Sequence, residues 1–247
     1  MCLIVFAWKV IPAIPLVAAA NRDEFYERAT APAAAWPDQP RIYAGRDLKA
    51  GGSWMGISQG EAAEQPSRFA AITNIRAPAE HKPDAPSRGH LVADYLAGTM
   101  TPQEYVEAIR AGSEAYNGFN LVLADRDTLI WFSNKGQGDP RNGLPLEPGV
   151  YGLSNALLDA PWPKVLKTKA QFASLLCLGA PDDAYFEMLS DTTLAPDMRL
   201  PETGVPIDLE RVLSAVRIET PGYGTRTSTV VKLYAEAPAE LHEVLIQ

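Results

Sequence analysis

Short apolar runs separated by turn-forming residues dominate the chain and predict a protein rich in β-strands. Residues 2–8 and 16–20 are two such runs, and the turn around Pro12 and Pro15 between them predicts a β-hairpin. Residues 29–40 are rich in Ala and Pro and predict an irregular surface segment. Further strands are predicted at residues 54–58, 69–74, 117–125, 129–133, 150–155, 214–219 and 225–234.

Other segments space their apolar residues as helices do. The clearest helix start is Thr101-Pro102-Gln103-Glu104, which combines a capping box with proline at the first helical position. Cys177 falls at the end of a later helix and is expected to be a core residue. Predicted helices cover residues 87–96, 101–109, 161–176 and 184–189.

The order of these elements is strands, helices, strands, helices and strands, and neighbouring strands pair mainly as hairpins. This order favours an α+β fold over a doubly wound parallel sheet. We expect antiparallel sheets packed face to face, with the helices outside. The chain has 247 residues, enough to bury a substantial core, and we predict one domain over residues 1–247.

Charge and cysteine content narrow the possible partners. A net charge of −8 with a pI near 5.0 argues against a nucleic-acid or anionic-membrane partner and favours small molecules. The two cysteines, Cys2 and Cys177, form no disulfide or zinc pattern, which is typical of a reducing compartment and predicts a cytoplasmic location. No metal site is expected, because His81, His90 and His242 lack metal-ligand spacing.

The apolar N-terminus has an alternative interpretation as a secretion signal, because it ends in the small residues Ala18-Ala19-Ala20. Against this, no Lys or Arg precedes the apolar run, Lys9 interrupts it, and Pro12 and Pro15 divide it. The same interruptions argue against a membrane span, which needs ~20 continuous apolar residues.

Cys2 is the main candidate for chemistry. If Met1 is removed, Cys2 carries both a thiol and a free α-amine, so a nucleophile and a nearby base occur on one residue. The amine titrates near ~8 and the thiol near ~8.5, which makes proton transfer between them feasible at neutral pH. The alternative is that Cys2 is only a small apolar residue at the start of a strand.

Other polar residues fall at the ends of predicted strands. Asn21-Arg22-Asp23-Glu24 follows the second apolar run, so a hairpin would place it near the start of the first strand, although a solvated loop would give the same pattern. Gly51-Gly52-Ser53 favours a tight turn over a phosphate-binding loop. Further polar residues at strand ends or tight turns are Asn74, Arg76, Asn155 and Arg226.

Several short motifs resemble those of the NRDE family of transport and Golgi organisation proteins, whose name spells residues 21–24. The matches occur in family order from position 1 to about 230. The motifs are Met1-Cys2, Ala19-Ala20-Asn21-Arg22-Asp23-Glu24-Phe25-Tyr26, Ala44-Gly45-Arg46-Asp47, Gly51-Gly52-Ser53-Trp54-Met55-Gly56, Thr73-Asn74, Asn117-Gly118-Phe119-Asn120-Leu121, Tyr151-Gly152-Leu153-Ser154-Asn155-Ala156 and Pro221-Gly222-Tyr223-Gly224-Thr225-Arg226-Thr227.

The NRDE family is similar in turn to N-terminal nucleophile (Ntn) hydrolases of the penicillin V acylase and bile-salt hydrolase type. This resemblance implies a four-layer αββα sandwich. It also implies that Cys2 is the nucleophile, that its own amine is the base, and that Asp23 orients this amine. Asn74 and Asn155 would be the oxyanion and substrate-carbonyl donors, and Arg226 would hold the charge balance of the site.

The chain departs from those hydrolases at one position. They have Arg before the Asn of this stretch, whereas this chain has Ala20 there and carries Arg22 two positions later. In a strand, two positions keep the same face but move a group by ~7 Å, so Arg22 is not expected to do the same job. The expected substrate-binding or supporting residues are Asn21, Arg22, Arg46, Trp54 and Arg76.

The resemblance leaves alternative functions open. The first is a cysteine hydrolase that cleaves a linear amide or related acyl bond and needs no cofactor. The second is a binding or trafficking protein for haem or an acyl-CoA-like lipid, in which Cys2 could be a thiolate ligand to haem iron. A structural or interaction role is a third. The expected partner is a small amide, acyl or haem-like molecule, and the oligomeric state stays open.

Overall fold

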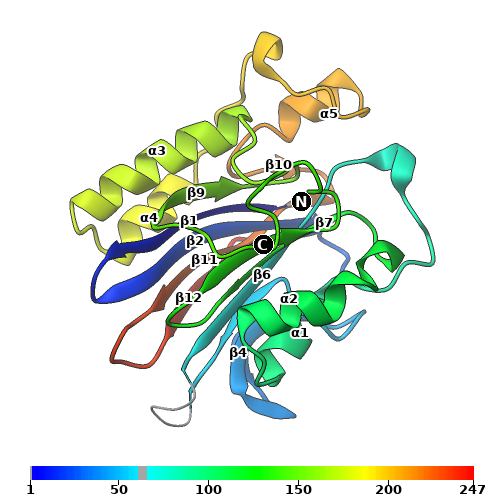
Figure 1. The fold of residues 1–247 in the computed structure, drawn as a ribbon. Helices are drawn as coiled ribbons and strands as arrows, with labels where there is room; N and C mark the ends of the chain where they lie inside the picture. Colours follow the sequence, from blue (N-terminus) through cyan, green and yellow to red (C-terminus); the bar gives the residue numbers. More distant parts are fainter. Residues whose placement is uncertain (1, 61–65) are drawn as a thin grey trace.

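Two antiparallel sheets of six strands each form the centre of the fold (Figure 1). The computed structural model describes residues 2–60 and 66–247. The first sheet contains β1 (Cys2–Ile11), β2 (Ile14–Phe25), β9 (Gly149–Leu153), β10 (Glu219–Thr220), β11 (Tyr223–Leu233) and β12 (Glu240–Leu245). The second contains β3 (Thr30–Trp36), β4 (Gln39–Asp47), β5 (Met55–Ser58), β6 (Arg68–Asn74), β7 (Phe119–Ala124) and β8 (Leu129–Ser133). The first has the order β10-β11-β2-β1-β9, with β12 also paired to β11, and the second runs from β3 to β8 in chain order.

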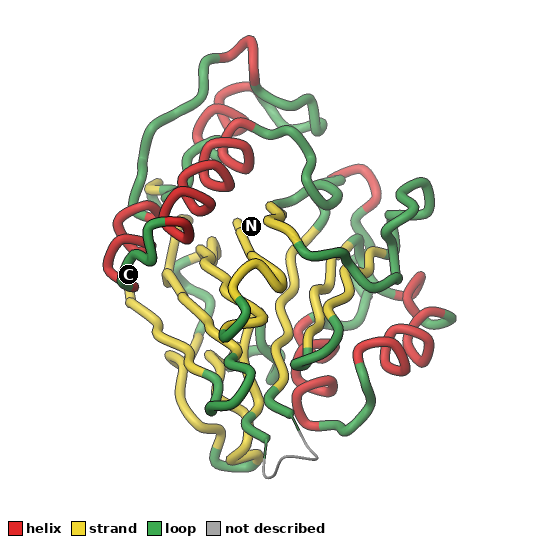
Figure 2. The backbone as a smooth tube through the Cα atoms, turned by 60° about the vertical axis from the view of Figure 1, so that its left-hand side comes forward, coloured by secondary structure: helices red, strands yellow, loops and turns green. Residues whose placement is uncertain are grey.

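Helices cover the outer face of each sheet (Figures 1 and 2). The second sheet carries α1 (Gly89–Ala97) and α2 (Pro102–Arg110), and the first carries α3 (Pro163–Cys177) and α4 (Asp182–Leu189). A short helix, α5 (Ile207–Val212), leads toward β10. The layers are helix, sheet, sheet and helix. The predicted α+β fold is therefore confirmed, and the sandwich is consistent with an Ntn-like fold.

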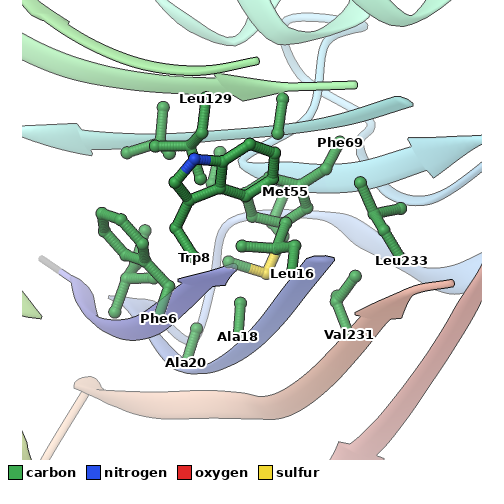
Figure 3. Close-up of a cluster of buried hydrophobic side chains, with 14 of the residues drawn as sticks. Phe6, Trp8, Leu16, Ala18, Ala20, Met55, Phe69, Leu129, Val231 and Leu233 are labelled. Atoms are coloured by element: carbon green, nitrogen blue, oxygen red, sulfur yellow. The ribbon is translucent and has the colours of Figure 1, made fainter. Parts of the chain in front are cut away.

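Apolar side chains from both sheets fill the space between them (Figure 3). Phe6, Trp8 and Leu16 of the first sheet pack in one cluster with Met55 and Phe69 of the second. Successive side chains of a strand point to opposite faces, so the residues of β1 between these positions pack under α3 and α4 instead. Both faces of β1 are thus buried, as its continuous apolar run predicts.

Strand β2 continues beyond its apolar half into the polar residues 21–23. Cys2 lies opposite Arg22 in the β1–β2 pair, and on the other side β11 places Thr225 opposite Asp23. Residues 21–23 are each at most 5% exposed. They therefore lie inside a central strand, which rules out a solvated loop.

The prediction of an irregular segment at residues 29–40 is wrong, because these residues form β3 and the start of β4. Strand β3 is the edge of its sheet, and its pairing with β4 is interrupted between Ala31 and Ala34. An edge position with an interrupted ladder tolerates Pro32, which has no backbone N–H to donate.

The predicted hairpin turn is too long, because it includes Pro15. Pro15 lies within β2, while the register jumps from the Trp8–Leu16 pair to the Ile11–Ile14 pair. This irregularity removes the need for an N–H at Pro15, because the ladder is broken there.

Cys177 is exposed, so its predicted place in the core is wrong. It is the last residue of α3 and faces solvent, whereas the preceding Leu176 packs in the core cluster under the helix. Of the predicted strand at 214–219, only Glu219 belongs to a strand, namely β10. Residues such as Val216 and Ile218 are buried by packing under the helices and around a small satellite cluster rather than by strand pairing. Neither α5 nor β12 was predicted.

The side chain of Asn21 links the first sheet to the helical layer through hydrogen bonds. Its Nδ2 donates to the carbonyl oxygens of Leu189, at the end of α4, and of Val216, at 2.8 and 2.9 Å. Its Oδ1 accepts a hydrogen bond from Ser228 Oγ at 2.6 Å. One buried amide thus joins four segments that are distant in the sequence.

We predict that Asn21→Ala lowers the free energy of unfolding by about 2–4 kcal/mol, because it leaves several buried polar groups without a partner. Urea unfolding of the two proteins measures the difference. The control is Asn117→Ala, whose amide makes its hydrogen bonds at the surface, with an expected loss under about 1 kcal/mol. Equal losses for the two variants would contradict the structural role of Asn21.

Candidate functional site

Cys2 lies at the start of β1 and borders a small cavity between the two sheets. The cavity has a volume of about 10 Å³. Because Cys2 and Arg22 are paired, their side chains lie on the same face of the sheet as Ile4 and Ala20. The walls are formed by Ile4, Ala20, Asn21, Arg22, Trp54, Met55, Ile72 and Thr229. The sulfur therefore faces a narrow space with mainly apolar walls and one guanidinium.

Burial is the largest influence on the Cys2 thiol, and it raises the pKa of this group. The carboxylate of Asp23 raises the pKa further, while the backbone N–H of Asp23 and the charge of Arg22 lower it. The net direction is upward, which favours the neutral thiol over the thiolate.

Arg22 forms part of the wall beside the Cys2 sulfur. Its guanidinium lies over the Trp54 ring, 4.1 Å from the centroid, and its charge is faced by Glu24 at 3.9 Å. Burial lowers the pKa of Arg22, and the Coulomb interactions with Cys2 and Glu24 oppose this shift. The Arg22–Trp54 stack thus forms part of the wall of the small cavity at Cys2.

Asp23 points to the other face of the sheet, toward the helical layer, because side chains alternate along β2. Its Oδ1 accepts a hydrogen bond from Thr225 Oγ1 at 2.7 Å. Burial raises the pKa of Asp23, and the nearby charges of Lys164 and Arg76 act in the opposite direction. The carboxyl group therefore sits in a buried environment that contains cations.

A buried ion pair between Arg76 and Glu210 lies near Asp23. Arg76 Nη1 donates to Glu210 Oε2, and the two side chains are only 5% and 3% exposed. Burial lowers the pKa of Arg76, whereas Glu210 opposes this change. Arg76 follows β6 of the second sheet and Glu210 belongs to α5. The ion pair therefore joins α5 to the segment after β6.

Asn155 reaches Cys2 through its neighbour in the chain. Ser154 Oγ donates to the Cys2 carbonyl oxygen at 3.0 Å and also contacts Asn155 Oδ1 at 3.3 Å. Asn155 Nδ2 donates to the Asn74 carbonyl oxygen at 2.9 Å. One of the two hydrogens of this amide is thereby engaged.

Asn74 lines a larger cleft next to this network. The cleft has a volume of about 560 Å³. Cationic groups from Arg76, Arg88 and Lys135 border it, and Phe25 forms an apolar wall. Its complete lining is Phe25, Asn74, Ile75, Arg76, Ala77, Pro78, Glu80, His81, Arg88, Asn117, Gly118 and Lys135.

Two of the predicted residues make contacts elsewhere. Arg226 Nη1 donates to the carbonyl oxygens of Phe25 and Arg28, at 3.2 and 2.7 Å, so it braces the end of β2. Arg46 pairs with Asp38 and lies over the ring of Trp36. The structure therefore brings Cys2 together with Asn21, Arg22, Asp23, Trp54, Arg76 and Asn155, places Asn74 in the adjoining cleft, and leaves Arg46 and Arg226 with other partners.

Sequence analysis missed three charged residues of this region. A negative charge on Cys2 would raise the pKa of both Lys164 and Arg88, and Glu210 forms the buried pair with Arg76. One signal was available for Lys164, because a cation in the first turn of a helix is unfavourable and calls for an explanation. Glu210 and Arg88 gave no such signal in the sequence.

A haem group bound through the Cys2 sulfur does not fit this site, because a cavity of about 10 Å³ does not admit a porphyrin. For metal ions, no group of at least three His, Cys, Asp or Glu side chains is suitably placed within residues 2–60 and 66–247.

The fold and the site together define the class of protein. It is an α+β sandwich that carries a cysteine at the start of a central strand, next to a buried acid, and it is consistent with an Ntn-like architecture. The chain belongs to the family described as Transport and Golgi organisation 2, whose match covers residues 1–247. This confirms the predicted resemblance to the NRDE family.

Several relatives are similar over nearly their full lengths. The bovine Transport and Golgi organization protein 2 homolog is 35% identical over 257 residues, covering 96% of this chain and 90% of the bovine protein. The human homolog is 34% identical with the same coverage, and the Drosophila melanogaster protein is 31% identical over 266 residues, or 96% and 89% of the two chains. None of the helices in the described part of the chain is long and apolar enough to cross a membrane.

We predict that iodoacetamide modifies Cys177 before Cys2 at pH 7 in protein that retains Met1. Cys177 is exposed, whereas the raised pKa of Cys2 shifts its thiolate, and therefore its reactivity, to higher pH. Peptide mass spectrometry after timed alkylation across pH 6–10 measures both rates. Denatured protein is the control, since both cysteines should then react alike. Faster modification of Cys2 at pH 7 in folded protein would refute this interpretation of its environment.

Proposed function

We propose that the chain is an Ntn-type cysteine hydrolase that acts on a linear amide or related acyl bond after Met1 has been removed. The observation that supports this proposal is the register that pairs Cys2 with Arg22, because Asp23 is then the next residue of β2 on the side of the Cys2 nitrogen. With Met1 attached, this nitrogen belongs to an amide and is not basic. After cleavage it becomes an amine next to a carboxylate, and the nucleophile acquires a base.

The reaction then proceeds in two steps. The amine takes the thiol proton, Sγ adds to the substrate carbonyl carbon, and the electrons of the C=O bond move to the oxygen. Asn155 and Asn74 would donate hydrogen bonds to this oxyanion. The C–N bond breaks as the amine passes its proton to the leaving nitrogen. Water then attacks the thioester, releases the acid and restores the thiol.

The cleft beside Asn74 supports a small substrate that carries a negative group. Arg76 and Arg88 border it in a protein whose net charge is −8, and Phe25 offers an apolar surface. An acyl group needs more room at the sulfur than about 10 Å³, so hydrolysis requires the Arg22–Trp54 stack to move. The mechanism also needs a reduced thiol, in agreement with the cytoplasmic location that we predict.

The second candidate is a protein that binds or carries haem or an acyl-CoA-like lipid without cleaving it. The closed cavity at Cys2 and the cationic cleft favour it, because the cleft could hold an anionic ligand while the sulfur stays covered. Thermal stabilisation by acyl-CoA, or a shift of the Soret band on haem titration, with no Cys2-dependent turnover would favour this function over hydrolysis.

We predict that purified protein lacking Met1 reacts with 2-cyanobenzothiazole, which condenses only with a terminal cysteine that has a free amine. Intact mass spectrometry detects the product. Cys2→Ala should abolish both this labelling and any amide hydrolysis found in a substrate screen, whereas Cys177→Ser should leave both intact, because Cys177 is exposed at the far end of α3.

Full hydrolysis by Cys2→Ala on a substrate of the wild-type protein would refute the proposal. A chain that keeps Met1 when isolated from its native cells would refute it as well, because the amine would then be absent.

A further inference from the structure

Lys164 is the most unusual charged residue outside the predicted site. It lies in the first turn of α3 and is only 3% exposed. Its Nζ is sealed from solvent, and within the described residues it has neither a hydrogen bond nor an ion pair. Buried ammonium groups without a partner are rare, since removing the charge from water costs several kcal/mol.

The position of Lys164 adds a second cost. The N-terminus of a helix carries a partial positive charge from the backbone dipoles, so a cation there is repelled. No side chain caps this end of α3. A residue that is unfavourable on both counts is the kind that proteins retain at functional sites.

Lys164 belongs to α3, which packs on the face of the first sheet toward which Asp23 points. Leu3 and Asn21 face the helical layer, and alternation along β2 puts Asp23 on that face too. Val165, the next residue of α3, packs in the same cluster as Leu3. Burial lowers the pKa of Lys164, and the carboxylate of Asp23 opposes this shift. The other groups that act on this pKa are Arg76 after β6, which lowers it, and Cys2 of β1 and Glu210 of α5, which raise it.

We propose that Lys164 is a positioning residue that keeps the α-amine of processed Cys2 unprotonated by competing with it for Asp23. This inference rests on the proposed function, because the amine exists only after Met1 removal. Arg76 has Glu210 and Arg22 has Glu24 as acidic neighbours. Asp23 would then act on two positive charges at once, the new amine and the Lys164 ammonium, with which it makes no direct ion pair. One carboxylate does not neutralise both.

The competition would favour the state that catalysis needs. If Asp23 faced the amine alone, the pair would hold the amine protonated and unable to accept the thiol proton. A fixed ammonium nearby makes a second positive charge unfavourable, so the amine releases its proton at a lower pH. Lys164 therefore acts through the amine and Asp23, without touching substrate.

The test measures the amine directly, in the Cys2→Ser background, where no thiol competes. The Met1-free protein, verified by intact mass, is acetylated with trace acetic anhydride across pH 5–10, and peptide mass spectrometry gives the midpoint of α-amine labelling. We expect a midpoint below the ordinary range of about 7.7–8.0. Adding Lys164→Met should raise it by about one pH unit or more, whereas Lys164→Arg should keep it low.

The matched control is Lys167→Met on the same helix, because Lys167 is half-exposed and pairs with Asp191. It should leave the midpoint unchanged. Lys164→Met should also raise the melting temperature, whereas removal of a merely structural residue would lower it. An unchanged midpoint in folded Lys164→Met protein overturns the assignment.

This outcome is separable from failure of the proposed function. A shifted midpoint in a protein that hydrolyses no amide would support Lys164 and count against the hydrolase. Hydrolysis that depends on Cys2, together with an unmoved midpoint, would do the reverse.

Discussion

The pairing of β1 with β2 is the constraint on which the rest of the site depends. The register of this ladder is continuous from the Cys2–Arg22 pair to the Trp8–Leu16 pair. It therefore brings the beginning of the chain to the polar end of β2. Since a slip by one residue would move every side chain to the opposite face, the apolar halves of both strands fix the position of Cys2. Burial of Phe6 and Trp8 between the sheets therefore also holds the cysteine in place.

The strands and helices with clear periodicity could be predicted because their patterns are local. The polar stretch 21–23 could not be assigned, since the groups that satisfy it are far away in the sequence. Asn21 depends on Leu189, Val216 and Ser228, and Asp23 depends on Thr225. Without those partners a strand with three buried polar residues would be unfavourable, so a loop was an equally good prediction.

The same reasoning explains which site residues were found. Cys2, Asp23 and Asn155 occur in motifs that resemble a known family, and the structure brings them to one end of the sandwich. Lys164 and Glu210 come from helices whose placement depends on tertiary packing, so their charges meet the site only in the folded chain. For Arg226, the family resemblance implied a role in the site. Its side chain instead donates to carbonyl groups at the end of β2, where the pairing of β11 with β2 is irregular between Thr225 and Thr227.

Strand alternation divides the candidate chemistry between the two faces of one sheet. The Cys2 side chain faces the other sheet, whereas Asp23 faces the helices. A main-chain nitrogen lies in the plane between these faces, so it can approach a group on either side. The α-amine that Met1 removal would create is thus suited to link the half-buried Cys2 thiol to the buried acid. A side-chain base on either face would have to reach through the sheet to do the same.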